Sequence, residues 1–149
     1  MRHCHSLTHT KITRAVASVR DEMGAMVITL SGQVLFPTGE ASLLPGAQEK
    51  LSLVAGLLRT MPNRSIQVVG YTDAAGDPNR NYGLSVARAQ SVRNFLVSNG
   101  VPPAQIRSTG VGAERPVASN DTPEGRAENR RVEIVLEPAA VGGGPADFE

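Results

Sequence analysis

Segments with the pattern of β-strands alternate along this chain with segments that have the pattern of α-helices, and this alternation restricts the fold more than any other feature. Four segments are β-branched or alternate between polar and apolar residues, and we expect strands at residues 26–36, 65–69, 105–110 and 131–136. The first of them could be two strands joined at Gly32. The last has the alternation that is typical of a half-exposed strand.

Two helices are expected between these strands. Pro45 begins the first one, because a missing N–H costs nothing at the first helical position, and Met61-Pro62 ends it. Its apolar residues recur at helical spacing, at Ala47, Leu51, Val54 and Leu58. The second helix covers residues 81–99 and stops at Gly100. The order β-α-β-α-β-β predicts an α+β two-layer sandwich, with the helices packed on one face of a mixed sheet.

The chain has 149 residues, a length that favours one domain, which we place at residues 26–137. Residues 1–25 are expected to be an N-terminal tail or partial helix, since residues 10–23 carry a thin apolar face at helical spacing. Residues 138–149 are rich in Pro and Gly and are expected to be a flexible tail. The sequence contains no secretory signal and no apolar stretch long enough to span a bilayer.

Histidine and cysteine are absent from residues 26–137, and the chain holds them only near its start, as His3, Cys4, His5 and His9. A catalytic triad with His, a Cys nucleophile and a zinc site of the usual N/S ligands are therefore excluded from the domain. We expect no catalytic residue, no cofactor and no metal site there. The terminal cluster could bind a metal or be part of a disordered tail. The formal net charge of +1 argues against nucleic acid as a partner.

Several ordered motifs carry a resemblance to a known family. They are GYTD at residues 70–73, NYGLSVARA at residues 81–89, VLF at residues 34–36, GVG at residues 110–112 and EGRAENRRV at residues 124–132. Together they resemble the OmpA-like peptidoglycan-binding domains, which include the peptidoglycan-associated lipoprotein and the periplasmic part of the flagellar stator. The resemblance covers residues 26–137 and implies the OmpA-like version of the fold above.

The resemblance implies a non-catalytic domain that binds the meso-diaminopimelate of the peptidoglycan peptide stem. In the family an Asp after the second strand takes the ligand's ammonium, and an Arg on the following helix takes its carboxylate; these positions match Asp73 and Arg88, 15 residues apart. Asn81 matches a further ligand contact. Thr72 and Gly39 match positions that line the pocket. One anion and one cation a few ångströms apart are also what a zwitterionic ligand requires.

The same residues admit other interpretations. Asp73 and Arg88 could form an ordinary salt bridge, and Asp73 with Asp77 could be the paired acids of a glycoside hydrolase. Arg130 could line the pocket, or it could make a structural ion pair with Glu124 or Glu128. Because side chains alternate along a strand, Arg130 and Arg131 are expected to point to opposite faces of the sheet.

The chain departs from the family pattern at two positions. Tyr71 stands where the family usually has His before the Thr-Asp pair, and Pro37 stands where an Asp commonly follows the Phe of the first strand. Pro37 cannot donate a backbone hydrogen bond, so it puts the shape of the first loop and any ligand contact by Gly39 in question. The proposed ligand-holding pair is present.

The resemblance implies a periplasmic or outer-membrane-associated protein that tethers the envelope to the wall. The alternative is an OmpA-like module that assembles with envelope proteins in a secretion, motility or envelope complex without binding the wall. Because the family works outside the cytoplasm, we expect the export signal or anchor to precede this sequence, as in a fragment or a gene with a misplaced start.

Overall fold

A five-stranded mixed sheet forms the centre of the computed structural model, which describes residues 18–22 and 24–138. The strands are β1 (Ser18–Glu22), β2 (Ala25–Ser31), β3 (Ile66–Tyr71), β4 (Ile106–Gly112) and β5 (Arg131–Leu136). Their spatial order is β1-β2-β5-β3-β4. All neighbours are antiparallel except β3 and β4, which are parallel because a helix connects them.

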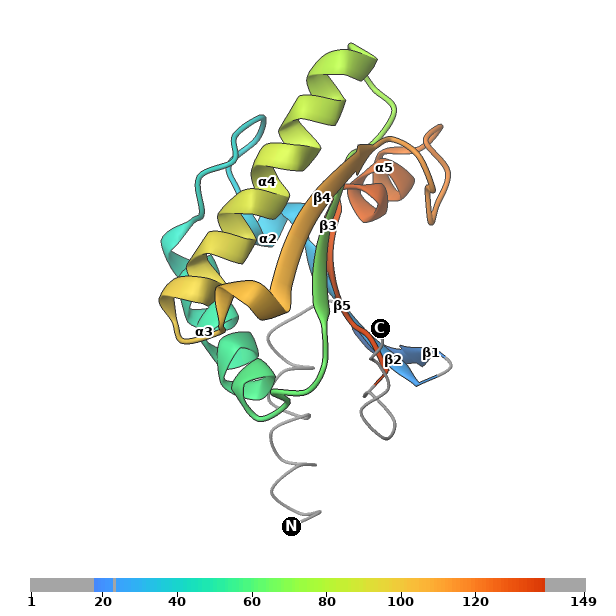
Figure 1. Ribbon diagram of the computed structural model, residues 1–149. Coiled ribbons are helices and arrows are strands. Elements are labelled where there is room, and N and C mark those ends of the chain that lie inside the picture. Colours follow the sequence, from blue (N-terminus) through green and yellow to red (C-terminus); the bar gives the residue numbers. More distant parts are fainter. Residues whose placement is uncertain (1–17, 23, 139–149) are drawn as a thin grey trace.

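Two long helices cover one face of this sheet (Figure 1). They are α3 (Pro45–Arg59) and α4 (Pro78–Ser98). Each begins at a Pro, which suits the first helical turn, and α4 begins before the expected residue 81. The apolar side chains between the two layers are fully buried and include Ile28, Leu30, Leu51, Leu58, Val68, Val92, Leu96 and Ile134. The predicted two-layer architecture and the β-α-β-α-β-β order are thus confirmed, and the additional elements described below extend them.

The expected first strand is shorter than predicted. It ends at Ser31, and residues that were expected to extend it form the short helix α2 (Gly32–Leu35). The Ser31 hydroxyl accepts a hydrogen bond from the Gln33 amide at 3.3 Å, which caps the helix. The Gly32 amide donates to the Arg130 carbonyl at 2.8 Å, so the chain turns here toward the end of β5.

Three further elements were not expected. Residues 18–22 form β1, which pairs with β2, so the prediction of a helix at residues 10–23 is wrong for that part. Residues 10–17 and the cluster of His3, Cys4, His5 and His9 lie outside the described residues. The 3-10 turn η1 (Pro103–Gln105) leads into β4. Helix α5 (Pro123–Asn129) precedes β5, and the Thr122 hydroxyl caps it at the Gly125 amide. A Thr-Pro-Glu start is a recognisable helix signal that could have indicated α5.

The prediction of a half-exposed last strand is also wrong. β5 lies between β2 and β3, and its polar residues Arg131 and Glu133 are 4% and 6% exposed. Arg131 Nε donates to Glu133 Oε2 at 2.9 Å, and the guanidinium lies 3.7 Å from the centre of the Tyr71 ring. Polar residues can therefore occupy this central strand because they compensate one another's charge.

Glycines allow α4 to approach the sheet very closely. A Cβ at Gly70 would collide with the backbone of Ser85, and a Cβ at Gly110 would collide with the backbone of Val86. The Ser85 hydroxyl, held in this contact, donates to the Tyr82 carbonyl and accepts from the Gly112 amide. The height of α4 above β3 and β4 is therefore set by two residues without side chains.

We predict that Gly110→Ala lowers the free energy of unfolding by about 1–3 kcal/mol, because the added methyl group has no space between β4 and α4. Gly83→Ala is the matched control, since nothing lies within 4 Å of a Cβ at this position of α4. It should leave stability unchanged or raise it by up to about 1 kcal/mol, because alanine favours the helix. Urea unfolding measures both; an equal effect of the two substitutions would contradict the close contact.

Candidate functional site

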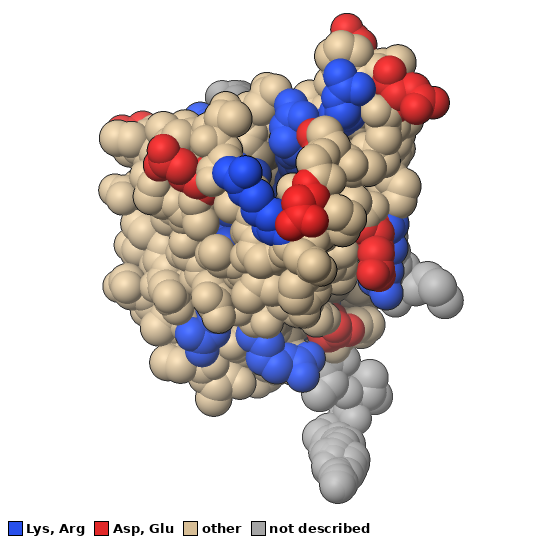
Figure 2. Space-filling view, turned by 90° about the horizontal axis from the view of Figure 1, so that it is seen from above, with Lys and Arg blue, Asp and Glu red and all other residues tan. Residues whose placement is uncertain are grey.

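A polar pocket lies at the end of the sheet where β3 runs into the loop before α4. Seen from above, basic and acidic side chains lie around a hollow in this end of the molecule (Figure 2). The pocket has a volume of about 360 Å³. Its walls come from α2, the loop after it, the end of β3, α4 and the residue before β5, through Gly32, Gln33, Phe36, Thr38, Gly39, Thr72, Asp73, Asn81, Leu84, Arg88 and Arg130.

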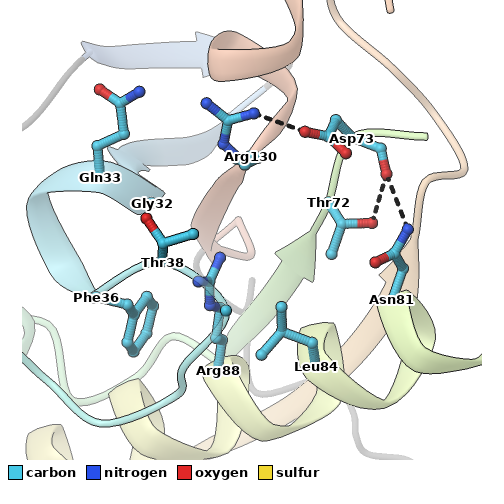
Figure 3. Close-up of a pocket in the computed structure, with 11 residues that line it drawn as sticks. Gly32, Gln33, Phe36, Thr38, Thr72, Asp73, Asn81, Leu84, Arg88 and Arg130 are labelled. Carbon is cyan, nitrogen blue, oxygen red and sulfur yellow. Dashed lines mark hydrogen bonds and ion pairs between the residues drawn. The ribbon is translucent and has the colours of Figure 1, made fainter. Parts of the chain in front are cut away.

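All six candidate site residues of the sequence analysis line this one pocket. Thr72 and Asp73 come from the end of β3, Asn81 and Arg88 from α4, Gly39 from the loop after α2, and Arg130 from the chain before β5. Figure 3 shows side chains from these elements around a common space. Segments far apart in the sequence meet here because β5 pairs with β3 and α4 packs on both β3 and β4.

Asp73 is held in place by the loop that it begins. One carboxylate oxygen, Oδ1, accepts from the Ala75 amide at 2.9 Å, and the other, Oδ2, accepts from Arg130 Nη1 at 2.6 Å. The Asn81 side chain donates to the Ala75 carbonyl at 2.7 Å and to the Asp73 carbonyl at 3.4 Å. Thr72 Oγ1 donates to the Asp73 carbonyl at 2.9 Å. Thr72 and Asn81 therefore fix the loop that presents the carboxylate.

Arg88 is a buried cation whose partners are neutral. The residue is 5% exposed, and its Nε donates to the Glu40 carbonyl at 2.8 Å. Nη2 donates to the Pro37 carbonyl at 3.3 Å, and the guanidinium lies 4.8 Å from the centre of the Phe36 ring. Burial, and next the nearby charge of Arg130, lower the pKa of Arg88. A group that is desolvated and close to a like charge gains from the arrival of an anion.

Asp73 and Arg88 do not form the ordinary salt bridge that was one alternative. The carboxylate pairs with Arg130, whereas Arg88 is bound by carbonyl groups and an aromatic ring. The glycosidase alternative also finds no support, because Asp77 is the N-cap of α4 and accepts from the Arg80 amide at 3.1 Å. Asp77 is not one of the residues that line the pocket.

Arg130 is the residue whose role the sequence left open. It pairs with Asp73 rather than with Glu124 or Glu128, and its guanidinium reaches into the pocket (Figure 3). Its neighbour Arg131 pairs with Glu133 beside Tyr71, on the sheet face away from α4, where Glu133 and Tyr71 line a second hollow. The expectation that these two arginines point in opposite directions is confirmed.

The two departures from the family pattern have different consequences. Pro37 contributes its carbonyl to Arg88, and proline keeps that acceptor, so the loop closes over Arg88 in spite of the missing N–H. Gly39 follows with φ of +73°, a conformation that favours glycine, and it lines the pocket as expected. Tyr71 lies on the other face of the sheet, where burial and then the charge of Glu133 raise its pKa.

Sequence reasoning missed the pocket residues that α2 and its following loop supply. They are Gly32, Gln33, Phe36 and Thr38, together with Leu84 from α4. The first three were expected in an extended strand, which would have carried them away from Arg88. The capping serine before Gly32 is the local signal that could have revealed the helical turn.

A metal-binding cluster and a membrane-spanning helix are both absent from the part of the chain that the structure describes. It holds no group of three or more His, Cys, Asp or Glu residues arranged to bind a metal ion. None of its helices combines the length and the apolar character needed to cross a membrane.

Comparison with known proteins assigns the fold and the family. Residues 35–130 match the OmpA family. The chain is 41% identical over 113 residues to the probable lipoprotein YiaD of Escherichia coli, covering 76% of this chain and 52% of that protein. It is 42% identical over 116 residues to the peptidoglycan-binding protein ArfA of Mycobacterium tuberculosis, covering 78% of this chain and 36% of that protein.

A solved structure agrees with these relatives. The cell wall anchor of the type VI secretion system from Pseudomonas aeruginosa superposes with a TM-score of 0.76 at 33% identity, covering 83% of this chain and 87% of that one. The chain spans about half or less of the length of the two curated relatives. The match to a family of non-catalytic domains agrees with the absence of His and Cys from residues 26–137. By the extent of these matches, the chain belongs to the OmpA family.

Proposed function

We propose that this domain binds cell-wall peptidoglycan without covalent chemistry, through the diaminopimelate residue of the peptide stem. Asp73 takes the ligand's ammonium, and Arg88 takes the carboxylate on the same carbon. The observation that carries the proposal is Arg88, a buried guanidinium with neutral partners in the wall of a pocket that also presents a carboxylate. The names of ArfA, a peptidoglycan-binding protein, and of the Pseudomonas cell wall anchor support it.

The geometry of the pocket suits a small zwitterionic group. A volume of about 360 Å³ accommodates one amino-acid terminus with its side chain, but not a folded partner. The loop carbonyls of Pro37 and Glu40 hold the Arg88 guanidinium, and Asn81 holds the Asp73 loop. Both charges are therefore placed before the ligand arrives, which reduces the entropy that binding costs.

Binding of a single stem should be weak. Each charged hydrogen bond contributes about 1.5–3 kcal/mol, while association costs at least about 4 kcal/mol. The net affinity therefore falls in the micromolar to millimolar range. Weak sites suit a reversible tether to a polymer that repeats its ligand, since several tethers together give avidity. The corresponding location is the periplasm, at the wall or the outer membrane, and the lipoprotein name of the Escherichia coli relative agrees with it.

Sedimentation with insoluble peptidoglycan of the diaminopimelate type tests the site. The wild-type domain should pellet. Arg88→Gln should lower the bound fraction as expected for an affinity reduced about tenfold or more, and Asp73→Asn as expected for an affinity reduced at least a few-fold. Arg88→Lys should be intermediate, because it keeps the charge but loses the fork of donors. Arg107→Gln, at an exposed position of β4, is the control and should bind like the wild type.

Thermal unfolding of each variant separates lost binding from lost structure. Equal pelleting by wild type, Asp73→Asn and Arg88→Gln would contradict the site. Failure of the folded wild type to pellet at all would favour the alternative, in which the fold serves assembly with other envelope proteins.

Competition with free amino acids tests the ligand group. We predict that millimolar meso-diaminopimelate releases the wild-type domain from sedimented peptidoglycan, because it offers the same ammonium and carboxylate on one carbon. Nα-acetyl-lysine amide at the same concentration has its α-groups blocked, so it carries the side-chain ammonium without that carboxylate and should release less. The fraction of protein in the supernatant is the measurement, and equal release by both compounds would exclude recognition of the diaminopimelate carboxylate.

A further inference from the structure

The charges in the pocket are unequal in number. Among the described residues that line it, Arg88 and Arg130 are cations and Asp73 is the anion. Asp73 and Arg130 already form an ion pair at 2.6 Å, in which their charges compensate one another. Of these three lining charges, Arg88 is the one that remains without an ionic partner among the residues described.

The two ends of a zwitterionic ligand therefore meet different conditions. Both oxygens of Asp73 accept hydrogen bonds in the pocket, one from Arg130 and one from the Ala75 amide. An incoming ammonium must share the carboxylate with Arg130 or displace it. The Arg130 side chain is 32% exposed against 13% for Asp73, so it is the solvent-facing member of the pair and the one that can move.

A carboxylate meets no such competitor. Arg88 uses Nε and Nη2 on the loop carbonyls, and within the described residues its Nη1 has no partner. Arg130 lies close enough for its charge to lower the pKa of Arg88. A ligand carboxylate between the two guanidiniums would satisfy the open donor and reduce the repulsion between like charges.

We infer that Arg130 pairs with Asp73 in the ligand-free state, so that the affinity of this pocket depends more on the carboxylate of the ligand than on its ammonium. This inference rests on the proposed function and specifies which diaminopimelate the site takes. A stem whose side-chain carboxylate is amidated loses the group that Arg88 and Arg130 share, so the domain binds walls with free diaminopimelate and discriminates against amidated walls. Arg130 is thus a specificity residue of the site.

Four soluble stem peptides that differ at one residue test the order of the two contributions. The first peptide carries meso-diaminopimelate, and the second carries its side-chain carboxamide. The third carries 2-aminopimelate, which keeps the side-chain carboxylate and lacks the ammonium. The fourth carries lysine, which keeps the side-chain ammonium and lacks the carboxylate. NMR titration of the wild-type domain measures millimolar affinities. We expect the carboxamide and lysine peptides to bind about tenfold more weakly or worse, and the aminopimelate peptide to lose only a few-fold.

The variant Arg130→Gln tests the cause of that order. This substitution frees Asp73 for the ammonium and removes one of the two cations near the carboxylate. Removing the ammonium should therefore lower the affinity by a larger factor than in the wild type, and amidation should lower it by a smaller factor. Arg107→Gln keeps the same change of residue at an exposed position on β4 and should leave both ratios as in the wild type.

The outcomes are distinguishable from failure of the proposed function. Binding of none of the four peptides by the folded wild type would overturn the proposed function and this inference with it. Binding of the meso-diaminopimelate peptide, with an equal or larger loss for aminopimelate than for the carboxamide, would overturn the inference alone. The wild-type comparison decides the order even if Arg130→Gln does not fold, and unchanged ratios in a folded Arg130→Gln would remove Arg130 from the explanation.

Discussion

The close contact between α4 and the parallel strands β3 and β4 is the constraint on which the rest of the structure depends. It is possible because Gly70 and Gly110 present no side chain to the backbone of Ser85 and Val86. The helix lies so low that the Ser85 hydroxyl can accept from the Gly112 amide at 3.0 Å. Arg88 stands one turn further along the same helix, so this contact also determines where its guanidinium reaches the pocket.

The pocket is organised by backbone groups as much as by its charged side chains. Carbonyls of the loop after α2 hold Arg88, and the ring of Phe36, which caps the end of α2, lies against it. On the opposite wall, Asn81 and the Ala75 amide hold the Asp73 loop. Because the loops are tied to the charges, the site has its geometry without a ligand, and a weak ligand need not fold it.

Arg130 and Arg131 are adjacent in the sequence but place their charges on opposite sides of the sheet. Arg131 is neutralised by Glu133 and stacked on Tyr71, which lets a central strand carry polar residues. Arg130 shares the pocket with Arg88, so that the pocket holds one more cation than anions among its lining residues. The formal net charge of +1 conceals this arrangement, because its separate charges are distributed by the fold.

The sequence by itself determined the elements that have local signals. It also determined the site residues that belong to motifs arranged in the family's order. The apolar spacing and Pro45 indicated α3, and Gly100 marked the end of α4. The order of the motifs was enough to assign Asp73, Asn81 and Arg88 to one site. The same local signals failed at residues 18–22 and 32–35. At residues 18–22, a five-residue pattern cannot distinguish an edge strand from the end of a helix. At residues 32–35, the capping Ser31 favours a helical turn over a continued strand.

Only the tertiary structure decided the partners of the charges. Arg130 lies 57 residues from Asp73 in the sequence, and the two meet because β5 pairs antiparallel with β3. Periodicity shows which face a residue prefers, but it contains no information about which strands become neighbours. Burial of Arg131 and Glu133 follows from the same pairing, since β5 is central only once β2 and β3 flank it. Long-range strand order therefore set the electrostatics of a site whose charged residues the sequence had already named.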